Sequence, residues 1–199
     1  MADSCSCFRL LAFSLYYYAV NTGGKEAYTM RLFHVSEESN IEIFVPRIPY
    51  RKDVDQSKGL VWSLTESQLP NWGTPRDCPR VCYRAVEEST KEDIDRFFSS
   101  SFRHCVAIEY DWHQKMLDTT LYIYEFDSAN FYFNERAGFY VSDKTETPIA
   151  VRKHENLYET LFRRNVEVRI LDGLWDLGEK VQKSSLKWSL CRMANAKPK

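Results

Sequence analysis

The sequence predicts an α+β protein: a single compact domain with a mixed, largely antiparallel β-sheet core and flanking helices. Three observations favour this class. Short runs rich in Val, Ile, Tyr and Phe alternate with stretches of helical periodicity after Met30. At 199 residues, 44% of them hydrophobic, the chain is long enough to bury a sizeable core. No internal repeat, low-complexity tract or long linker divides these runs.

The first 29 residues differ from the rest. The run FRLLAFSLYYYAV, at 8–20, is apolar but too short for a bilayer, which takes ~20 residues. It lacks the basic n-region and the clear cleavage site of a signal peptide. The pattern of a folded domain begins at Met30. We therefore expect residues 1–29 to be an upstream extension, with Met30 as the natural start, and 30–195 to be a domain that is stable without them. A membrane-associating leader is the alternative.

Ten short runs have the composition of β-strands. They are MRLFHV (30–35), IEIFVP (41–46), GLVWSL (59–64), VCYRAV (81–86), HCVAIEY (104–110), TTLYIYEF (119–126), NFYFNE (130–135), FYVS (139–142), TPIAVR (147–152) and VEVRIL (166–171). Pro46 and Pro49 end the second run, because proline cannot donate to a strand ladder. Gly138 stands between two runs and suits a hairpin or a bulge.

Three helices are predicted between these strands. TESQLPNW (65–72) can start a helix with Thr65 as its cap. The next helix begins with the capping-box-like pair Thr90 and Asp93. ENLYETLFRRN (155–165) is the third. The apolar residues expected to face inward are Ile94, Phe97 and Phe98 in the second helix and Leu157, Leu161 and Phe162 in the third.

The last predicted helix starts near Asp176 and covers DLGEKVQKSSLKWSLCRM. Its expected packing stripe is Leu177, Val181, Ser184 and Trp188, and Lys180, Lys183 and Lys187 fall on a different face. A short lysine row in a nearly neutral protein is most often a solvated helix face. The chain has 27 basic and 28 acidic residues, so its net charge creates no strong electrostatic field that would attract nucleic acid. We therefore do not expect a nucleic acid partner.

Six cysteines are spread through a chain too large to need disulfides, which indicates a reducing, cytoplasmic environment. Cys78 and Cys82, in the spacing C-x-x-x-C, could form a zinc site with His104 and Cys105. No second short ligand pair accompanies them. We therefore expect free buried cysteines and no metal.

The common catalytic motifs give no function, because the sequence has no Gly-rich phosphate loop, nucleophile elbow or His-Glu-x-x-His. In the proline-stiffened loop TPRDCPR, Arg76 and Arg80 flank Asp77. Two guanidinium groups in such a loop can grip a phosphate or carboxylate of a cofactor, or they can make an internal salt bridge that orders the loop.

Several blocks carry a resemblance to a known family. MRLFHVSEESNIEIFVPR, LVW, TPRDCPRVCYRA, TTLYIYEF, AGFYVS and TPI resemble small bacterial proteins with an uncharacterised domain of unknown function. The resemblance covers about residues 30–195. It implies an intact domain and brings no activity with it.

The order of polar residues also resembles the layout of the ADP-ribosyltransferase-like superfamily, which binds NAD or a related ADP-ribosyl group. This resemblance implies that His34 holds the ribose nearest the nicotinamide. Trp62 or Ser63, with Thr65, would line the nicotinamide pocket. Glu146 would stabilise an oxocarbenium-like transition state, since a carboxylate favours developing positive charge. The sequence departs from the superfamily in lacking a tyrosine at the second position.

Each of these residues also has a structural interpretation. His34 can be a packed strand residue, Trp62 a core anchor and Glu146 a solvated carboxylate. Two functions are therefore open: an enzyme or enzyme-derived pocket for NAD or an ADP-ribosyl group, or a non-catalytic binding module. Convergence of His34, Ser63 and Glu146 on one cleft would favour the first.

Overall fold

A computed structural model of the chain describes residues 18–20, 27–49, 54–99 and 101–199. The chain divides into two units, Met1–Met30 and Arg31–Lys199. In the first unit, β1 (Tyr18–Val20) pairs antiparallel with β2 (Ala27–Thr29). Most of the apolar run at 8–20 lies outside the described residues, so the upstream extension stays a prediction. Within the described ranges no helix has the length and apolarity needed to cross a membrane.

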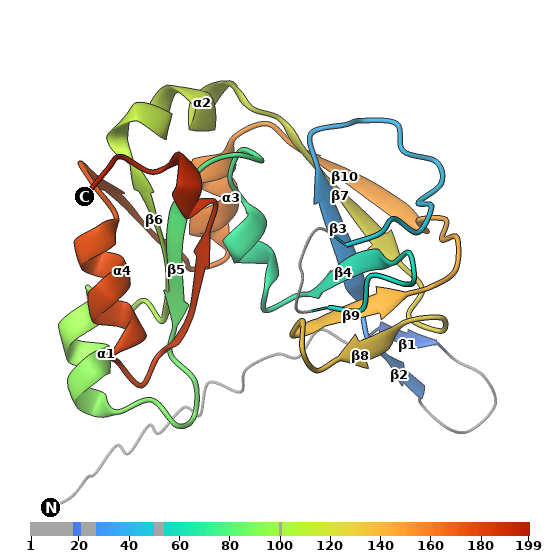
Figure 1. The fold of residues 1–199 in the computed structure, drawn as a ribbon, viewed down its shortest axis with the longest axis horizontal. Coiled ribbons are helices and arrows are strands. Elements are labelled where there is room, and N and C mark those ends of the chain that lie inside the picture. Colours follow the sequence, from blue (N-terminus) through green and yellow to red (C-terminus); the bar gives the residue numbers. More distant parts are fainter. Residues whose placement is uncertain (1–17, 21–26, 50–53, 100) are drawn as a thin grey trace, which may run out of the picture. The chain divides into compact units, whose positions relative to one another are not determined.

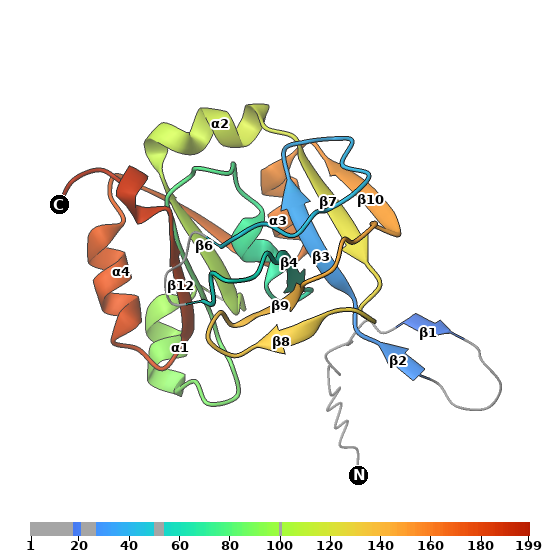
Figure 2. The same ribbon diagram turned by 45° about the vertical axis from the view of Figure 1, so that its right-hand side comes forward.

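The second unit contains a six-stranded sheet of order β10-β7-β3-β4-β9-β8, with antiparallel neighbours throughout. Its strands are β3 (Leu32–Ser36), β4 (Val61–Thr65), β7 (Leu121–Phe126), β8 (Tyr132–Asn134), β9 (Phe139–Ser142) and β10 (Ala150–His154). Figure 1 shows β4, β9 and β8 running in a different direction from β3, β7 and β10. Figure 2 shows the latter three side by side.

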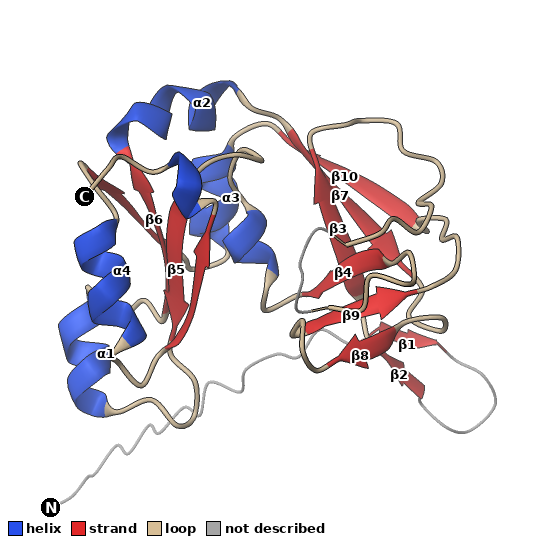
Figure 3. Ribbon diagram, viewed as in Figure 1, coloured by secondary structure: helices blue, strands red, loops and turns tan. Residues whose placement is uncertain are grey.

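A second, four-stranded sheet has the order β11-β6-β5-β12, in which only the β11–β6 pair is parallel. Its strands are β5 (Arg80–Arg84), β6 (His104–Glu109), β11 (Glu167–Leu171) and β12 (Lys187–Cys191). Helices gather around this sheet (Figure 3). They are α1 (Lys91–Phe97), α2 (His113–Asp118), α3 (Leu157–Arg163) and α4 (Trp175–Gln182). The predicted α+β class is confirmed, with two sheets in its core.

The main core lies on the two faces of the four-stranded sheet. Tyr83 and Cys105 on one face pack with Phe97 of α1 and Val181 of α4. Residues of the other face pack against α3 and against β7 of the six-stranded sheet. This cluster contains Cys78, Cys82, Val106, Ile108, Met116, Leu121, Leu157, Leu161 and Val166. Because this cluster contains residues of both sheets and of α3, α3 lies between the two sheets (Figure 1).

Several local predictions are confirmed. Thr90 caps α1, because its side chain accepts the main-chain N–H of Asp93. Gly138 has φ of 72° in the β8–β9 hairpin, a left-handed conformation that glycine adopts without strain. Leu157 and Leu161 are buried in α3 as expected.

Three other local predictions are wrong. Residues 41–46 form no strand, since Phe44 makes only an isolated bridge, with Glu146, and Arg47 just beyond the run makes another, with Leu60. Thr65 caps no helix. It ends β4, its hydroxyl donates to Gln68, and the helix that follows is a short 3-10 turn, Leu69–Trp72. Phe162 is 70% exposed on α3 because Leu157 and Leu161 already supply the buried face of this two-turn helix.

The last predicted helix is also wrong in its second half. α4 ends at Gln182, and Lys187–Cys191 forms β12, which pairs with β5. Trp188 and Lys187 therefore belong to a strand and do not continue the helical rows. Helical spacing cannot reveal this strand, because its partner lies about a hundred residues away in the sequence.

Replacing Trp188 by Ala is expected to lower the free energy of unfolding by about 1 to 2 kcal/mol. A fully buried tryptophan would lose ~3 to 5 kcal/mol, but Trp188 is 42% exposed. Urea unfolding of the two proteins measures the difference. A loss above about 3 kcal/mol would contradict the partial exposure of Trp188.

Replacing Glu125 by Gln is expected to cost about 1 to 3 kcal/mol at pH 7. The Glu125 carboxylate accepts two hydrogen bonds from Arg31, at 2.6 and 2.7 Å, and one from Arg152 at 2.8 Å. The bonds from Arg31 hold the pKa of Glu125 below its usual value. This stabilisation is therefore complete above the ordinary glutamate pKa and is lost as the pH falls through the folded-state pKa.

Urea unfolding at pH 7 and at pH 3 measures both effects. The Glu125→Gln variant should lose less stability than the natural protein over this range. Glu155→Gln, at an exposed ion pair with Lys153, is the matched control and should change little. Equal acid sensitivity of the natural protein and Glu125→Gln would count against the role of this carboxylate.

Candidate functional site

The two central strands of the six-stranded sheet separate after two residue pairs. β3 and β4 pair only as Leu32 with Thr65 and Phe33 with Leu64. Beyond this point β3 stays on β7 as far as Ser36, and β4 stays on β9 as far as Val61. The facing edges 34–36 and 61–63 are thus unpaired with each other. We call this place the β3–β4 separation.

His34 lies where the separation begins. Its Nδ1 is 3.1 Å from the main-chain oxygen of Trp62. A carbonyl oxygen can only accept, so Nδ1 carries the proton and donates it. Nε2 has no partner among the described residues and is not sealed from solvent. The ring therefore presents a free acceptor at Nε2.

Charged groups surround the imidazole. Burial lowers the pKa of His34, the hydrogen bond to Trp62 opposes this, and the charges of Arg76 and Arg47 lower the pKa further. Glu38 acts in the opposite direction. His34 is therefore neutral at pH 7, with two guanidinium groups near an uncharged acceptor.

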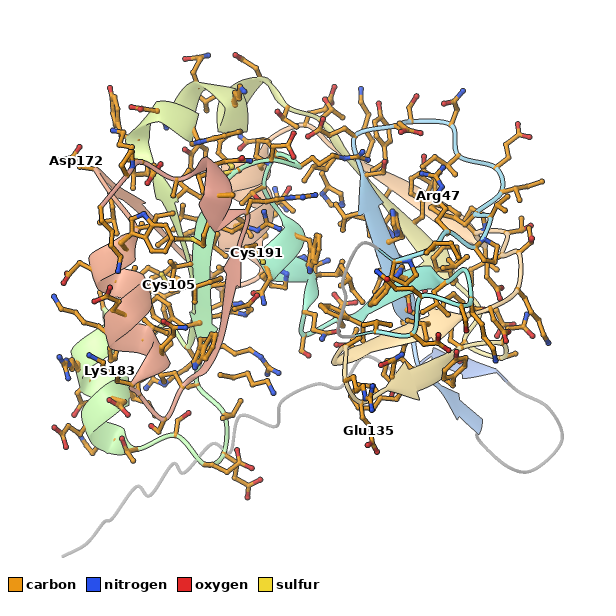
Figure 4. All side chains as sticks on the ribbon, in the orientation of Figure 1. Arg47, Cys105, Glu135, Asp172, Lys183 and Cys191 are labelled. Atoms are coloured by element: carbon orange, nitrogen blue, oxygen red, sulfur yellow. The ribbon has the colours of Figure 1, made fainter. Side chains whose placement is uncertain are left out.

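Arg47 was not among the residues selected from the sequence. It lies on the segment between β3 and β4 (Figure 4), where its main chain pairs in both directions with Leu60. A Cβ on Gly59 would lie 2.9 Å from main-chain atoms of Pro46, so only glycine permits this approach. The prolines around Arg47 in FVPRIP were the available signal of a fixed segment.

The other predicted pocket residues lie beside the separation on different faces. Strand alternation puts Ser63 and Thr65 on the same face as His34, and Trp62 on the opposite one. The Ser63 hydroxyl donates to the main-chain oxygen of Tyr140 at 3.0 Å. The Trp62 ring packs against Phe139 with centroids 6.1 Å apart.

Glu146 is buried, which overturns the interpretation of a solvated carboxylate. It accepts a hydrogen bond of 2.5 Å from the Ser142 hydroxyl and one of 3.5 Å from the Asn130 amide. Phe44 touches both candidate catalytic residues: its ring lies 4.9 Å from that of His34, and its main chain pairs with that of Glu146. The described contacts include none between His34 and the Glu146 carboxylate.

The two arginines of TPRDCPR have different surroundings. Arg80 is only 2% exposed, and its guanidinium donates to the main-chain oxygens of Asn71 and Cys78. Arg76 is exposed near His34, and its main-chain N–H donates to Glu37 at 2.8 Å. The internal salt bridge is not formed, because Asp77 pairs with Arg192 instead. Only Arg76 lies at the β3–β4 separation.

The cysteines considered for zinc lie on both faces of the four-stranded sheet. Cys78 and Cys82 belong to one packed cluster and Cys105 to the other. Burial raises the pKa of Cys78 and of Cys105 to about 12. Within the described ranges no three His, Cys, Asp or Glu side chains are arranged to hold a metal ion.

A surface hollow of about 610 Å³ lies between α3 and β11, lined by residues such as Phe102, Tyr158 and Phe162. None of the predicted site residues lines it. Of the predicted site residues, His34, Ser63, Thr65 and Arg76 lie at the β3–β4 separation. The Trp62 ring faces the other side of the sheet, and Arg80 and the Glu146 carboxylate are bonded to other groups.

These features define an α+β domain whose larger sheet opens between its two central strands, with a neutral histidine at the opening. The chain belongs to a family of unknown function, DUF6886, whose model matches residues 33–196. The resemblance to an uncharacterised family is therefore confirmed. Comparison with curated proteins gave no match, and comparison with solved structures gave none either.

Proposed function

We propose that the chain binds a nucleotide-type ligand, NAD or another ADP-ribosyl compound, at the β3–β4 separation. The observation that carries the proposal is the state of His34. Its proton is committed to the Trp62 carbonyl, and its free Nε2 can accept a hydrogen bond from a ribose hydroxyl. Arg47 and Arg76 are near enough to influence His34 and can bind the phosphates of the same ligand.

Glu146 has a structural role in this proposal. Its two carboxylate oxygens are engaged by Ser142 and Asn130, and its main chain is fixed by Phe44. A carboxylate that stabilises an oxocarbenium-like transition state has to face the sugar. We therefore infer binding without catalysis by Glu146. The free buried thiols Cys78, Cys82 and Cys105 support a reducing, cytoplasmic location.

Titration calorimetry with NAD and with ADP-ribose tests the proposal. We expect saturable binding of at least one of them. The variant His34→Asn should weaken it about tenfold or more, because an Asn amide can still donate to the Trp62 carbonyl but offers no acceptor in place of Nε2. Glu146→Gln is the comparison variant and should keep the affinity.

Two results would overturn the proposal. One is the absence of binding by the folded protein at millimolar NAD and ADP-ribose, which would favour an interaction module. The other is unchanged affinity in His34→Asn. Loss of affinity in Glu146→Gln, with unchanged unfolding behaviour, would show that this carboxylate faces the ligand, as a catalytic role requires.

A further inference from the structure

The partly or fully buried arginines of the described residues fall into two groups. Three have a carboxylate within ion-pair distance: Arg31 with Glu125, Arg164 with Glu66, and Arg169 with Glu167. Arg80 and Arg84 have none among the described residues. A buried charge without a partner raises the free energy of the folded state. The presence of Arg80 and Arg84 at these positions therefore needs an explanation other than an ion pair.

Arg80 and Arg84 lie on one face of β5, since they are separated by an even number of strand residues. Lys187 of β12 is directly opposite Arg84 in the antiparallel ladder and shares this face. Like charges at directly opposed positions destabilise a sheet. Three cations thus occupy one face of two adjacent strands.

No acidic residue of the four strands offsets them on this face. The other strand residues on it are Cys82, His104, Val106, Ile108, Ser189, Cys191, Val168 and Ile170. His104 adds no charge at neutral pH, because burial and the charge of Arg84 lower its pKa to about 4. Burial also lowers the pKa of Arg84, as expected for a guanidinium without a countercharge.

Arg80 is held rigidly within this group. Its Nε donates to the Asn71 oxygen at 2.6 Å, its Nη1 to the Cys78 oxygen at 2.9 Å, and its guanidinium lies 5.2 Å from the Trp72 ring centroid. Arg84 is partly exposed and Lys187 is exposed. No hydrogen bond of either side chain occurs among the described residues. Both remain available to a ligand.

We propose that Arg84 and Lys187, on the same strand face as Arg80, bind the phosphoryl group of a small phosphorylated ligand or free phosphate. A planar guanidinium bonds two phosphate oxygens at once, and a lysine ammonium adds a point charge. This site is on the four-stranded sheet and uses no residue of the β3–β4 separation. It does not depend on the proposed nucleotide pocket.

Thermal unfolding of the full chain tests this proposal, with sodium phosphate, pyrophosphate and ADP each compared with sodium chloride at equal ionic strength. Phosphate should raise the Tm, on the order of 5 °C at about 100 times its Kd. A larger effect of ADP than of phosphate that persists in His34→Asn and is lost in Arg84→Met would identify a phosphorylated molecule as the ligand of this site. An equal effect of the two would identify the free anion.

Arg84→Met and Lys187→Met retain apolar stems without the charge. Each should have a higher Tm than the natural protein in phosphate-free buffer, because one of two opposed charges is gone, and each should lose most of the phosphate effect. Lys180→Met, which removes an exposed lysine paired with Asp176, and His34→Asn should keep the full phosphate effect. The proposal fails if phosphate stabilises no more than chloride does, or if Arg84→Met keeps the full shift.

Discussion

Replacing Leu161 by Ala is expected to reduce the free energy of unfolding by about 2 to 5 kcal/mol. Leu161 is fully buried on α3, in the cluster that joins the four-stranded sheet to β7. A Cβ on Gly73 would lie 2.8 Å from the Leu161 side chain, so the two surfaces meet closely here. Shortening the Leu161 side chain therefore removes buried apolar surface. It also leaves a cavity that the closely packed neighbours cannot fill. Urea unfolding at pH 7 measures the loss.

The neighbouring residue provides the control. Phe162 is 70% exposed, and Phe162→Ala should change the free energy of unfolding by less than about 0.5 kcal/mol. Similar losses for the two variants would mean that α3 presents a different face to the core. The pair thus tests the orientation of the helix that lies between the sheets.

Replacing Arg47 and Arg76 together by Ala is expected to weaken the affinity for ADP-ribose about 100-fold or more. A hydrogen bond to a charged group contributes about 1.5 to 3 kcal/mol, and about 1.4 kcal/mol corresponds to tenfold in affinity. The bonds of Arg47 with Leu60 and of Arg76 with Glu37 use main-chain atoms and survive the change. Calorimetric titration at two salt concentrations measures the loss of affinity and how far salt screens the contribution of the two arginines.

A double variant of Arg96 and Arg163 is the matched control. It removes two exposed guanidinium groups from α1 and α3 and should leave the affinity unchanged. If both double variants weaken binding equally, the effect is one of net charge and the two arginines at the β3–β4 separation have no specific role.

Local signals predicted much of the fold. The Thr90 cap and the Gly138 hairpin depend on residues a few positions apart, so the sequence shows them directly. The strand β12 and the exposure of Trp188 depend on pairing with β5, far away in the chain. The apolar run 41–46 has the composition of a strand, but only isolated bridges form at Phe44 and Arg47, and the prolines at 46 and 49 lack the N–H that a continuous ladder needs.

The candidate site was predictable to a similar extent. His34 stood out as a histidine in an apolar strand, and the structure places it where the sheet opens. Its tautomer depends on the Trp62 carbonyl, which is free only because β3 and β4 separate. The burial of Glu146 likewise depends on Ser142 and Phe44. Such contacts between distant segments leave no periodic pattern in a single sequence.

Nitrogen NMR of the histidine side chains tests the proposed ligand site, because the chain has four histidines and the site depends on one nitrogen of the His34 ring. At pH 7 we expect His34 to be neutral, with a protonated Nδ1 and an unprotonated Nε2. Addition of NAD or ADP-ribose should then shift the Nε2 resonance of His34, while those of His104, His113 and His154 stay in place. A protonated Nε2 in the free protein, or ligand binding that leaves the His34 resonances unmoved, would contradict the proposed ligand site.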